Sequence, residues 1–181
     1  PSSAASDVYK RQEMYSYQID YVIQNTTPTV ECITVAEAKQ YCRVNNNVED
    51  DLFVDLIIQA RQIVEKVTNL KLVPCQVDVW FNNAGGNFQL PFGPVTYVLG
   101  MWDYQNTQIP STIYRLMGAQ YPVVRYPLYG EIKMSYMAGF DCVPTDLKVA
   151  MLDQINYDYE NRGMDVNDMG ICEKTMRACQ R

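Results

Sequence analysis

Three segments of the chain carry apolar residues at the three- and four-residue spacing of an amphipathic helix. We expect helices over 34–44, 48–69 and 145–162. The first begins with Thr34 and Glu37, the spacing of a capping box in which each side chain binds a backbone N–H of the first turn. The pattern therefore predicts a substantial helical part on both sides of the middle of the chain.

The second predicted helix has one wide apolar face and two apolar residues outside it. The face consists of Leu52, Phe53, Leu56, Ile57, Ala60, Ile63, Val64 and Val67. At about 100° per residue, Val54 and Ile58 fall on the opposite, polar side. That side also carries Arg61, Gln62 and Glu65 and is expected to be solvated. Val54 and Ile58 are either incidental there or mark the place where a neighbouring subunit packs.

The third predicted helix is apolar on more than one side. Its main face consists of Leu147, Met151, Leu152, Ile155 and Tyr159, whereas Val149, Ala150 and Tyr157 point elsewhere. Such a helix is expected to lie between other elements of structure. The candidate subunit-interface residues are Val54, Ile58, Val149, Ala150 and Tyr157.

Residues 73–137 carry the two-residue alternation and the turn signals of β-structure. The Asn- and Gly-rich run 82–87 predicts a hairpin turn after which the chain returns on a partner strand, and the Pro-rich run 91–94 predicts a further corner. Further short strands are expected over 95–102, 112–117, 122–126 and 131–137. The sequence thus predicts an α+β fold in which a small twisted sheet or barrel-like lobe follows two helices and precedes a third.

Both ends of the chain are expected to lie outside this central part. Residues 1–13 are unlike the rest and resemble translated adapter sequence, so we expect a non-native leader and a natural start at Met14. Residues 14–31 predict an N-terminal arm with a short strand over 15–22. Residues 164–181 predict a C-terminal helix or tail, with the helix running from 167 or 168 to 178.

Composition argues against most catalytic and metal chemistry. The chain of 181 residues has no histidine, which is the commonest general base and metal ligand. None of its six cysteines lies in a C-x-x-C pair, so we expect reduced thiols, no metal and no cofactor. A formal net charge of −6 does not suit a protein that grips nucleic-acid phosphates, although DNA could slide past it. No window is long and apolar enough to span a bilayer.

Two alternatives would give the chain a ligand or a substrate. A carbohydrate- or ligand-binding β module could use an aromatic platform of Trp80, Trp102 and Tyr104, although the two tryptophans are more simply explained as bracing the sheet. A hydrolase would need a carboxylate pair chosen from Asp141, Asp146, Asp153 and Asp158. The last two stand five residues apart on one predicted helix, so they do not face each other, and we expect both to be solvated.

A series of short motifs occurs in a fixed order between residues 32 and 163. It comprises ITVAEAK at 33–39 with RV at 43–44, EDD at 49–51, IIQAR at 57–61, LPFGPV at 90–95, YMAGF at 136–140 with VP at 143–144, DLK at 146–148 and YENR at 159–162. This series resembles the tailed-bacteriophage head–tail connector (adaptor) family.

The resemblance implies a small antiparallel bundle of three to four helices with an inserted antiparallel β lobe. It also implies a structural subunit without enzymatic activity, which forms a ring, usually of twelve copies, between the portal and a tail or stopper protein. DNA passes through such a ring without sequence-specific binding. The implied place is the neck of the virion, after assembly in the cytoplasm of the bacterial host. The family's C-terminal segment reaches toward the portal, so the candidate portal contacts are Ile171, Met176, Arg177 and Arg181.

Overall fold

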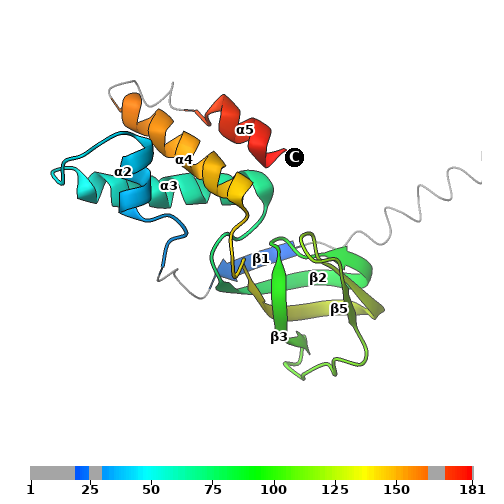
Figure 1. Cartoon of the computed structure of the whole chain (residues 1–181). Coiled ribbons are helices and arrows are strands. Elements are labelled where there is room, and N and C mark those ends of the chain that lie inside the picture. Colours follow the sequence, from blue (N-terminus) through cyan, green and yellow to red (C-terminus); the bar gives the residue numbers. More distant parts are fainter. Residues whose placement is uncertain (1–18, 25–29, 163–169, 181) are drawn as a thin grey trace, which may run out of the picture. The chain divides into compact units, whose positions relative to one another are not determined.

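The computed structural model describes residues 19–24, 30–162 and 170–180. These residues form four helices and five strands in two compact units (Figure 1). Of the described residues, 19–24 and 75–139 belong to the sheet unit, and 30–74, 140–162 and 170–180 belong to the helical unit. The fold is therefore α+β, with the main β segment inserted between helices, as predicted.

Local signals mark the start of the first helix and the end of the second. The helices are α2 (Val35–Tyr41), α3 (Asp50–Thr68), α4 (Thr145–Glu160) and α5 (Glu173–Cys179). The capping box of α2 is confirmed, because the Glu37 N–H donates to Thr34 Oγ1 at 3.2 Å and the Thr34 N–H donates to Glu37 Oε2 at 2.8 Å. α2 ends earlier than predicted, and α3 ends at Thr68 because Asn69 adopts a left-handed φ of 55°. The expected start of α5 at 167 or 168 lies outside the described residues.

The start of α3 meets the end of α4, so these two helices run antiparallel. The rings of Phe53 and Tyr159 stack with centroids 5.0 Å apart, and the Tyr159 hydroxyl donates to Glu49 Oε2 at 2.7 Å. Arg162 lies 3.4 Å from the Glu49 carboxylate. Beneath these contacts lies one apolar core, formed by Ile33, Ala38, Phe53, Leu56, Ile57, Ala60, Val64, Leu70, Leu72, Leu147, Ala150, Met151 and Ile155.

The sheet unit is antiparallel, and two long strands dominate it. The strands are β1 (Ile19–Gln24), β2 (Cys75–Gln89), β3 (Val95–Asp103), β4 (Arg115–Met117) and β5 (Val123–Ala138). Their order is β1-β2-β5-β3, and β4 also pairs with β5. The predicted N-terminal arm thus contributes a strand to the sheet, since β1 pairs with β2.

The predicted hairpin turn over 82–87 is wrong, because β2 continues through it. Its pairing with β5 is interrupted only by irregularities between Phe81 and Ala84 and between Ala84 and Gly86. Gly86 has a φ of 66°, which a glycine adopts without strain. Asparagine and glycine serve a bulge as well as a turn, and a bulge lets the strand continue with a bend. The two strands expected over 122–126 and 131–137 are likewise one strand, β5.

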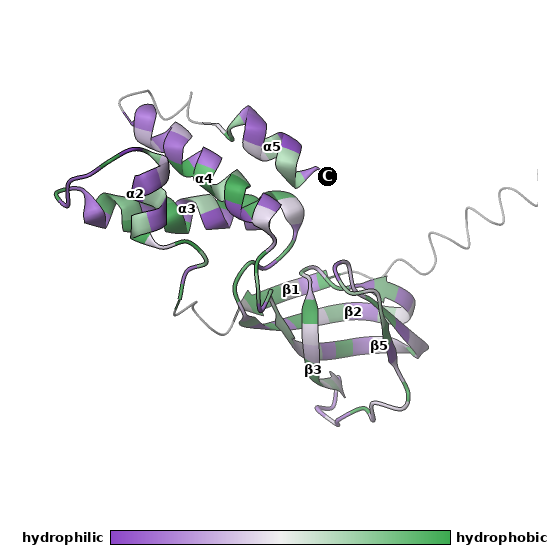
Figure 2. Ribbon diagram, in the orientation of Figure 1, coloured by the Kyte–Doolittle hydropathy of each residue, from purple (hydrophilic) through white to green (hydrophobic). Residues whose placement is uncertain are grey.

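The alternation along β2 and β5 buries one side of the sheet in its own apolar core. Hydrophobic and hydrophilic residues alternate along both ribbons (Figure 2). The buried residues include Val77, Val79, Phe81, Phe88, Met101, Ile132, Met134 and Tyr136. The rings of Phe81 and Phe88 lie 4.7 Å apart, one on each side of the bulged region. The sheet unit and the helical unit therefore each have a hydrophobic core of their own.

The corner at 91–94 is held against the segment before β5. The Leu90 N–H donates to the Pro122 carbonyl at 2.9 Å. A Cβ atom on Gly93 would lie 1.9 Å from the backbone oxygen of Gln120. Because that neighbour is backbone, it cannot move aside as a flexible side chain would. The glycine in this motif is therefore required by a close approach of two chain segments.

We predict that Gly93→Ala lowers the free energy of unfolding by about 2 kcal/mol, because one of the two segments must shift. Thermal unfolding followed by circular dichroism, which reports on both the sheet unit and the helical unit, measures the change. Gly170→Ala is the matched control, since a Cβ there meets nothing within 4 Å. If the two variants lowered the free energy of unfolding by the same amount, the close approach of Gly93 to Gln120 would be contradicted.

Candidate functional site

The C-terminal half of α3 buries two charged residues that were expected to be solvated. Arg61 and Glu65 are both 6% exposed. Arg61 Nε lies 2.8 Å from Glu31 Oε2, and Arg61 also lies 3.5 Å from Glu65 Oε2. Lys71 Nζ lies 3.1 Å from the same Glu65 oxygen, and the Leu72 N–H donates to Glu65 Oε1 at 3.0 Å. We call these four residues, Glu31, Arg61, Glu65 and Lys71, the charge network.

The charge network is formally neutral, which is why it can be buried. Burial by itself lowers the pKa of the Arg61 guanidinium, but the hydrogen bond and charge of Glu31, with the charge of Glu65, outweigh it and raise that pKa. The expectation of a solvated face around Arg61 and Glu65 was wrong because Glu31 and Lys71 come from segments outside the helix. Helical periodicity carries no information about such partners.

We predict that Arg61→Met lowers the free energy of unfolding by about 3 kcal/mol, because it leaves two carboxylates facing a single lysine in a buried place. Urea unfolding monitored by the helical circular dichroism signal measures the loss. Lys66→Met is the control, because Lys66 is exposed on the same helix, and its effect should stay within about 0.5 kcal/mol. Similar midpoints for the two variants would show that the charge network contributes little.

Four of the five candidate interface residues keep some exposed surface. Val54 on α3 and Val149 on α4 are each 43% exposed, and Ile58 and Tyr157 are half-buried. Ala150 is different, since it is fully buried in the helical core and its carbonyl accepts a hydrogen bond from Thr175 Oγ1 at 3.0 Å. It packs against its own chain and has no surface left for a neighbouring subunit, so its selection as an interface residue is corrected.

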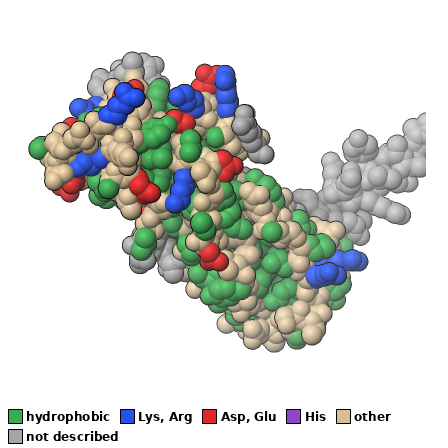
Figure 3. All heavy atoms as spheres, in the orientation of Figure 1, with side chains coloured by type: hydrophobic (Ala, Val, Ile, Leu, Met, Phe, Trp, Pro, Cys, Tyr) green, Lys and Arg blue, Asp and Glu red, His purple; other side chains and the backbone are tan. Residues whose placement is uncertain are grey.

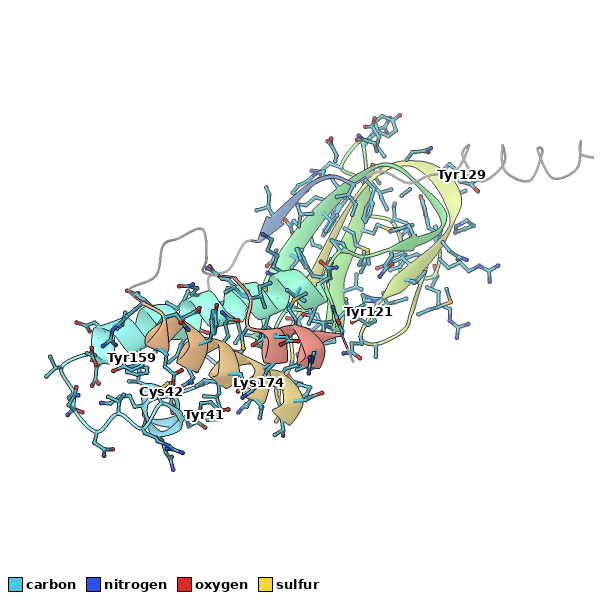
Figure 4. All side chains as sticks on the ribbon, turned by 90° about the horizontal axis from the view of Figure 1, so that it is seen from above. Tyr41, Cys42, Tyr121, Tyr129, Tyr159 and Lys174 are labelled. Atoms are coloured by element: carbon cyan, nitrogen blue, oxygen red, sulfur yellow. The ribbon has the colours of Figure 1, made fainter. Side chains whose placement is uncertain are left out.

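A groove lies between α2 and α4. Its hollow has a volume of about 430 Å³ and is lined by Ile33, Glu37, Gln40, Tyr41, Lys148 and Leu152. The Tyr41 hydroxyl donates to Asp153 Oδ1 at 2.7 Å, and this bond raises the pKa of Tyr41 to about 12. Lys174 of α5 lies 3.9 Å from the same oxygen, and Figure 4 shows Tyr41 and Lys174 on their two helices. Sequence reasoning missed this groove, because its lining combines residues of two helices with no common motif.

α5 is attached to α4 by buried polar groups. Gln154 accepts a hydrogen bond from the Cys172 N–H at 2.9 Å and donates to Asp158 Oδ1 at 2.9 Å. Among the candidate portal contacts, Ile171 is exposed, Met176 is half-buried, and Arg177 is exposed in an ion pair with Glu173. Arg181 lies outside the described residues.

Asp158 is buried, at 2% exposure, and the expectation that it is solvated was wrong. Gln154 holds one carboxylate oxygen, and the described residues give the other oxygen no hydrogen-bond partner. Burial raises the pKa of Asp158, and the hydrogen bond from Gln154 opposes that rise only in part. The folded protein therefore holds the Asp158 proton more tightly than the unfolded chain does.

It follows that stability from Asp158 is present below its ordinary pKa of 3.8 and is lost as the pH rises toward the raised value. We predict that Asp158→Asn, measured against wild type by melting temperature, gains relative stability as the pH rises above 3.8, because wild type then loses the stability that protonated Asp158 provides. Asp141→Asn, which makes the same change at an exposed position, is measured in the same series for comparison. If the difference in melting temperature between Asp158→Asn and wild type did not change with pH, the raised pKa of Asp158 would be contradicted.

The structure does not favour the two ligand-binding alternatives. Lys133 Nζ lies 4.8 Å from the ring centroid of Trp80 and 5.7 Å from that of Trp102, so the protein's own cation occupies the space between the rings. Tyr104 is exposed on the turn that follows β3. The four aspartates do not form a carboxylate pair through any contact between described residues: Asp141 is exposed and Asp146 accepts from the Leu147 N–H.

The described residues include neither a candidate metal site nor a membrane-spanning helix. Among those residues, no group of three or more cysteine, aspartate and glutamate side chains is placed to hold a metal ion. No helix within the described ranges is long and apolar enough to cross a membrane. The charged side chains visible in Figure 3 gather over the helical unit, whereas the visible face of the sheet unit is mostly hydrophobic and uncharged.

Three solved structures share this fold over most of both chains. A chain in the neck of an empty gene transfer agent particle, computed with C6 symmetry, is 20% identical with a TM-score of 0.68, covering 87% of this chain and 94% of that one. A chain of the virion of a native gene transfer agent particle is 21% identical, with a TM-score of 0.66 and coverage of 86% and 93%. A chain in the neck of the native particle, computed with C12 symmetry, is 19% identical, with a TM-score of 0.65 and coverage of 87% and 94%.

No protein-family model and no curated protein sequence matches the chain. At about one identical residue in five, the likeness to the three structures concerns the fold. This chain therefore has the fold of chains found in gene transfer agent particles, two of them from necks. The fold agrees with the one that the connector resemblance implies.

Proposed function

We propose that this protein is a structural ring subunit of the neck of a phage-like particle, where it joins the portal to the tail. The observation that carries the proposal is the likeness of fold to two neck chains, which covers 87% of this chain and 94% of each of them. A match over nearly all of both chains includes the sheet unit as well as the helical unit. The motif series between residues 32 and 163 supports the same assignment independently of the fold.

The symmetry of the similar assemblies supports a closed ring. The two neck structures were computed with C6 and C12 symmetry. A twelve-copy ring is compatible with both, and it is the number that the connector resemblance implies. DNA would pass through the centre of this ring. The net charge of −6 favours passage over binding, because an acidic protein repels the phosphate backbone.

We assign the portal contact to the exposed part of the C-terminal segment. Ile171, which precedes α5, and Arg177 on α5 offer an exposed apolar and an exposed cationic side chain, and Met176 is half-buried. Gln154 and Thr175 hold this segment on α4, so it would present a fixed surface. A tail or stopper protein would bind elsewhere on the ring. Such a subunit needs no catalytic residue, metal or cofactor.

The test is to mix the purified chain with the portal protein of the same particle and to measure the masses of the complexes by native mass spectrometry. We expect one portal ring carrying a fixed number of copies, twelve if the symmetry agrees with the neck structures. Including the portal matters because a ring of this kind can close only on docking. A chain that stays monomeric and leaves the portal unbound would refute the proposal.

A further inference from the structure

The N-terminal half of α3 presents an exposed stripe with apolar and acidic residues. Val54 is 43% exposed, Ile58 is half-buried, and Asp51 and Asp55 are exposed beside them. These four residues, Asp51, Val54, Asp55 and Ile58, are spaced so that they share one side of the helix, and we call them the α3 stripe. Further along α3, the same side of the helix carries Arg61 and Glu65 of the charge network, which are buried. The exposed stripe therefore ends before Arg61.

The groove between α2 and α4 has the complementary character. Ile33 and Leu152 give it apolar walls, and Lys148 supplies a cation. Among the described residues that line it, the one carboxylate is Glu37. The backbone and hydroxyl of Thr34 hold this carboxylate in the capping box, and these hydrogen bonds lower the pKa of Glu37. Lys39 and Arg43 line a second hollow on the other side of α2, where Lys39 is paired with Asp50 at 2.6 Å, so the cation of the groove itself is Lys148.

The groove and the stripe belong to different parts of the helical unit. The groove is lined by α4, α2 and the residue before α2's cap, and no residue of α3 lines it. The stripe belongs to α3 alone and faces away from the core. A chain with two different complementary surfaces can bind copies of itself head to tail, and such contacts form a ring when the rotation closes.

We propose that the α3 stripe of one copy docks into the α2–α4 groove of the next copy. Val54 and Ile58 enter the hollow against Ile33 and Leu152, while Asp51 and Asp55 approach Lys148. The hollow of about 430 Å³ is large enough for such side chains, because binding pockets typically measure about 300–1,000 Å³. This inference rests on the proposed function, since it names the contact that closes the ring. The occupant is a second copy, because the stripe, with its apolar and acidic side chains, and the groove, with Ile33, Leu152 and Lys148, occur on the same chain.

A pair of charge reversals tests the contact. Asp55→Lys places a cation on the stripe, and Lys148→Glu places a carboxylate in the groove. Each variant alone should form at least about tenfold fewer rings on the portal, because like charges then meet at every contact. Mixed in equal amounts, the two variants should form rings again, because the changed stripe meets the changed groove and the unchanged stripe meets the unchanged groove. Native mass spectrometry should then find equal numbers of the two variants in each ring.

The controls separate folding and portal binding from the contact itself. Lys66→Glu reverses an exposed charge on α3 outside the stripe and should form rings as wild type does. Circular dichroism of each variant checks that the helical unit is folded. Recovery in the mixture is itself a control for folding, because a misfolded variant cannot be rescued by its partner.

Each other outcome overturns the inference in a recognisable way. If each variant alone still forms rings, the ring closes through another surface and the proposed function stands. If both fail alone and the mixture also fails, the stripe and the groove do not bind each other. If the variants form rings but no longer bind the portal, the groove takes the portal instead. If wild type itself forms no ring, the proposed function fails together with the inference.

Discussion

The helical unit depends on the buried charge network around α3. Arg61 and Glu65 can leave water only because Glu31 and Lys71 neutralise them. The network lies beside the segment that leads out of α3, since Glu65 also binds the Leu72 N–H. It therefore determines which half of the polar side of α3 is covered by the chain and which half remains open. The exposed Val54 and the half-buried Ile58 lie on the same side of α3, in the half that this network does not reach.

The sequence was informative where structure is decided within a few residues. The capping box of Thr34 and Glu37 and the end of α3 before Asn69 follow from local hydrogen bonds and backbone preference. Predictions from the sequence were wrong or missing where the structure depends on residues that lie far apart in the sequence. The run 82–87 bulges instead of turning because β5 is long enough to pair with both parts of β2. Burial of Arg61 and Asp158, and the groove between α2 and α4, likewise arise from elements that sequence periodicity does not place together.

The low identity to the similar structures has a physical explanation. A fold tolerates many substitutions so long as apolar residues stay at core positions and the total volume is kept. Surface residues are free of that constraint, so two chains can share a fold at 20% identity and still differ in their contacts. For this reason the ring contact has to be argued from the residues of this chain. The α3 stripe and the α2–α4 groove consist of such residues. In the proposed contact, the apolar residues of the stripe meet the apolar walls of the groove, and Asp55 meets Lys148.

The most direct measurement is an electron cryomicroscopy reconstruction of the portal with this chain bound. The account predicts a closed ring of identical copies around an open centre, with Ile58 of each copy against Leu152 of the next. It also predicts that the charge network stays intact inside every copy. Copies bound singly to the portal, or a ring in which α3 contacts no neighbouring subunit, would contradict it.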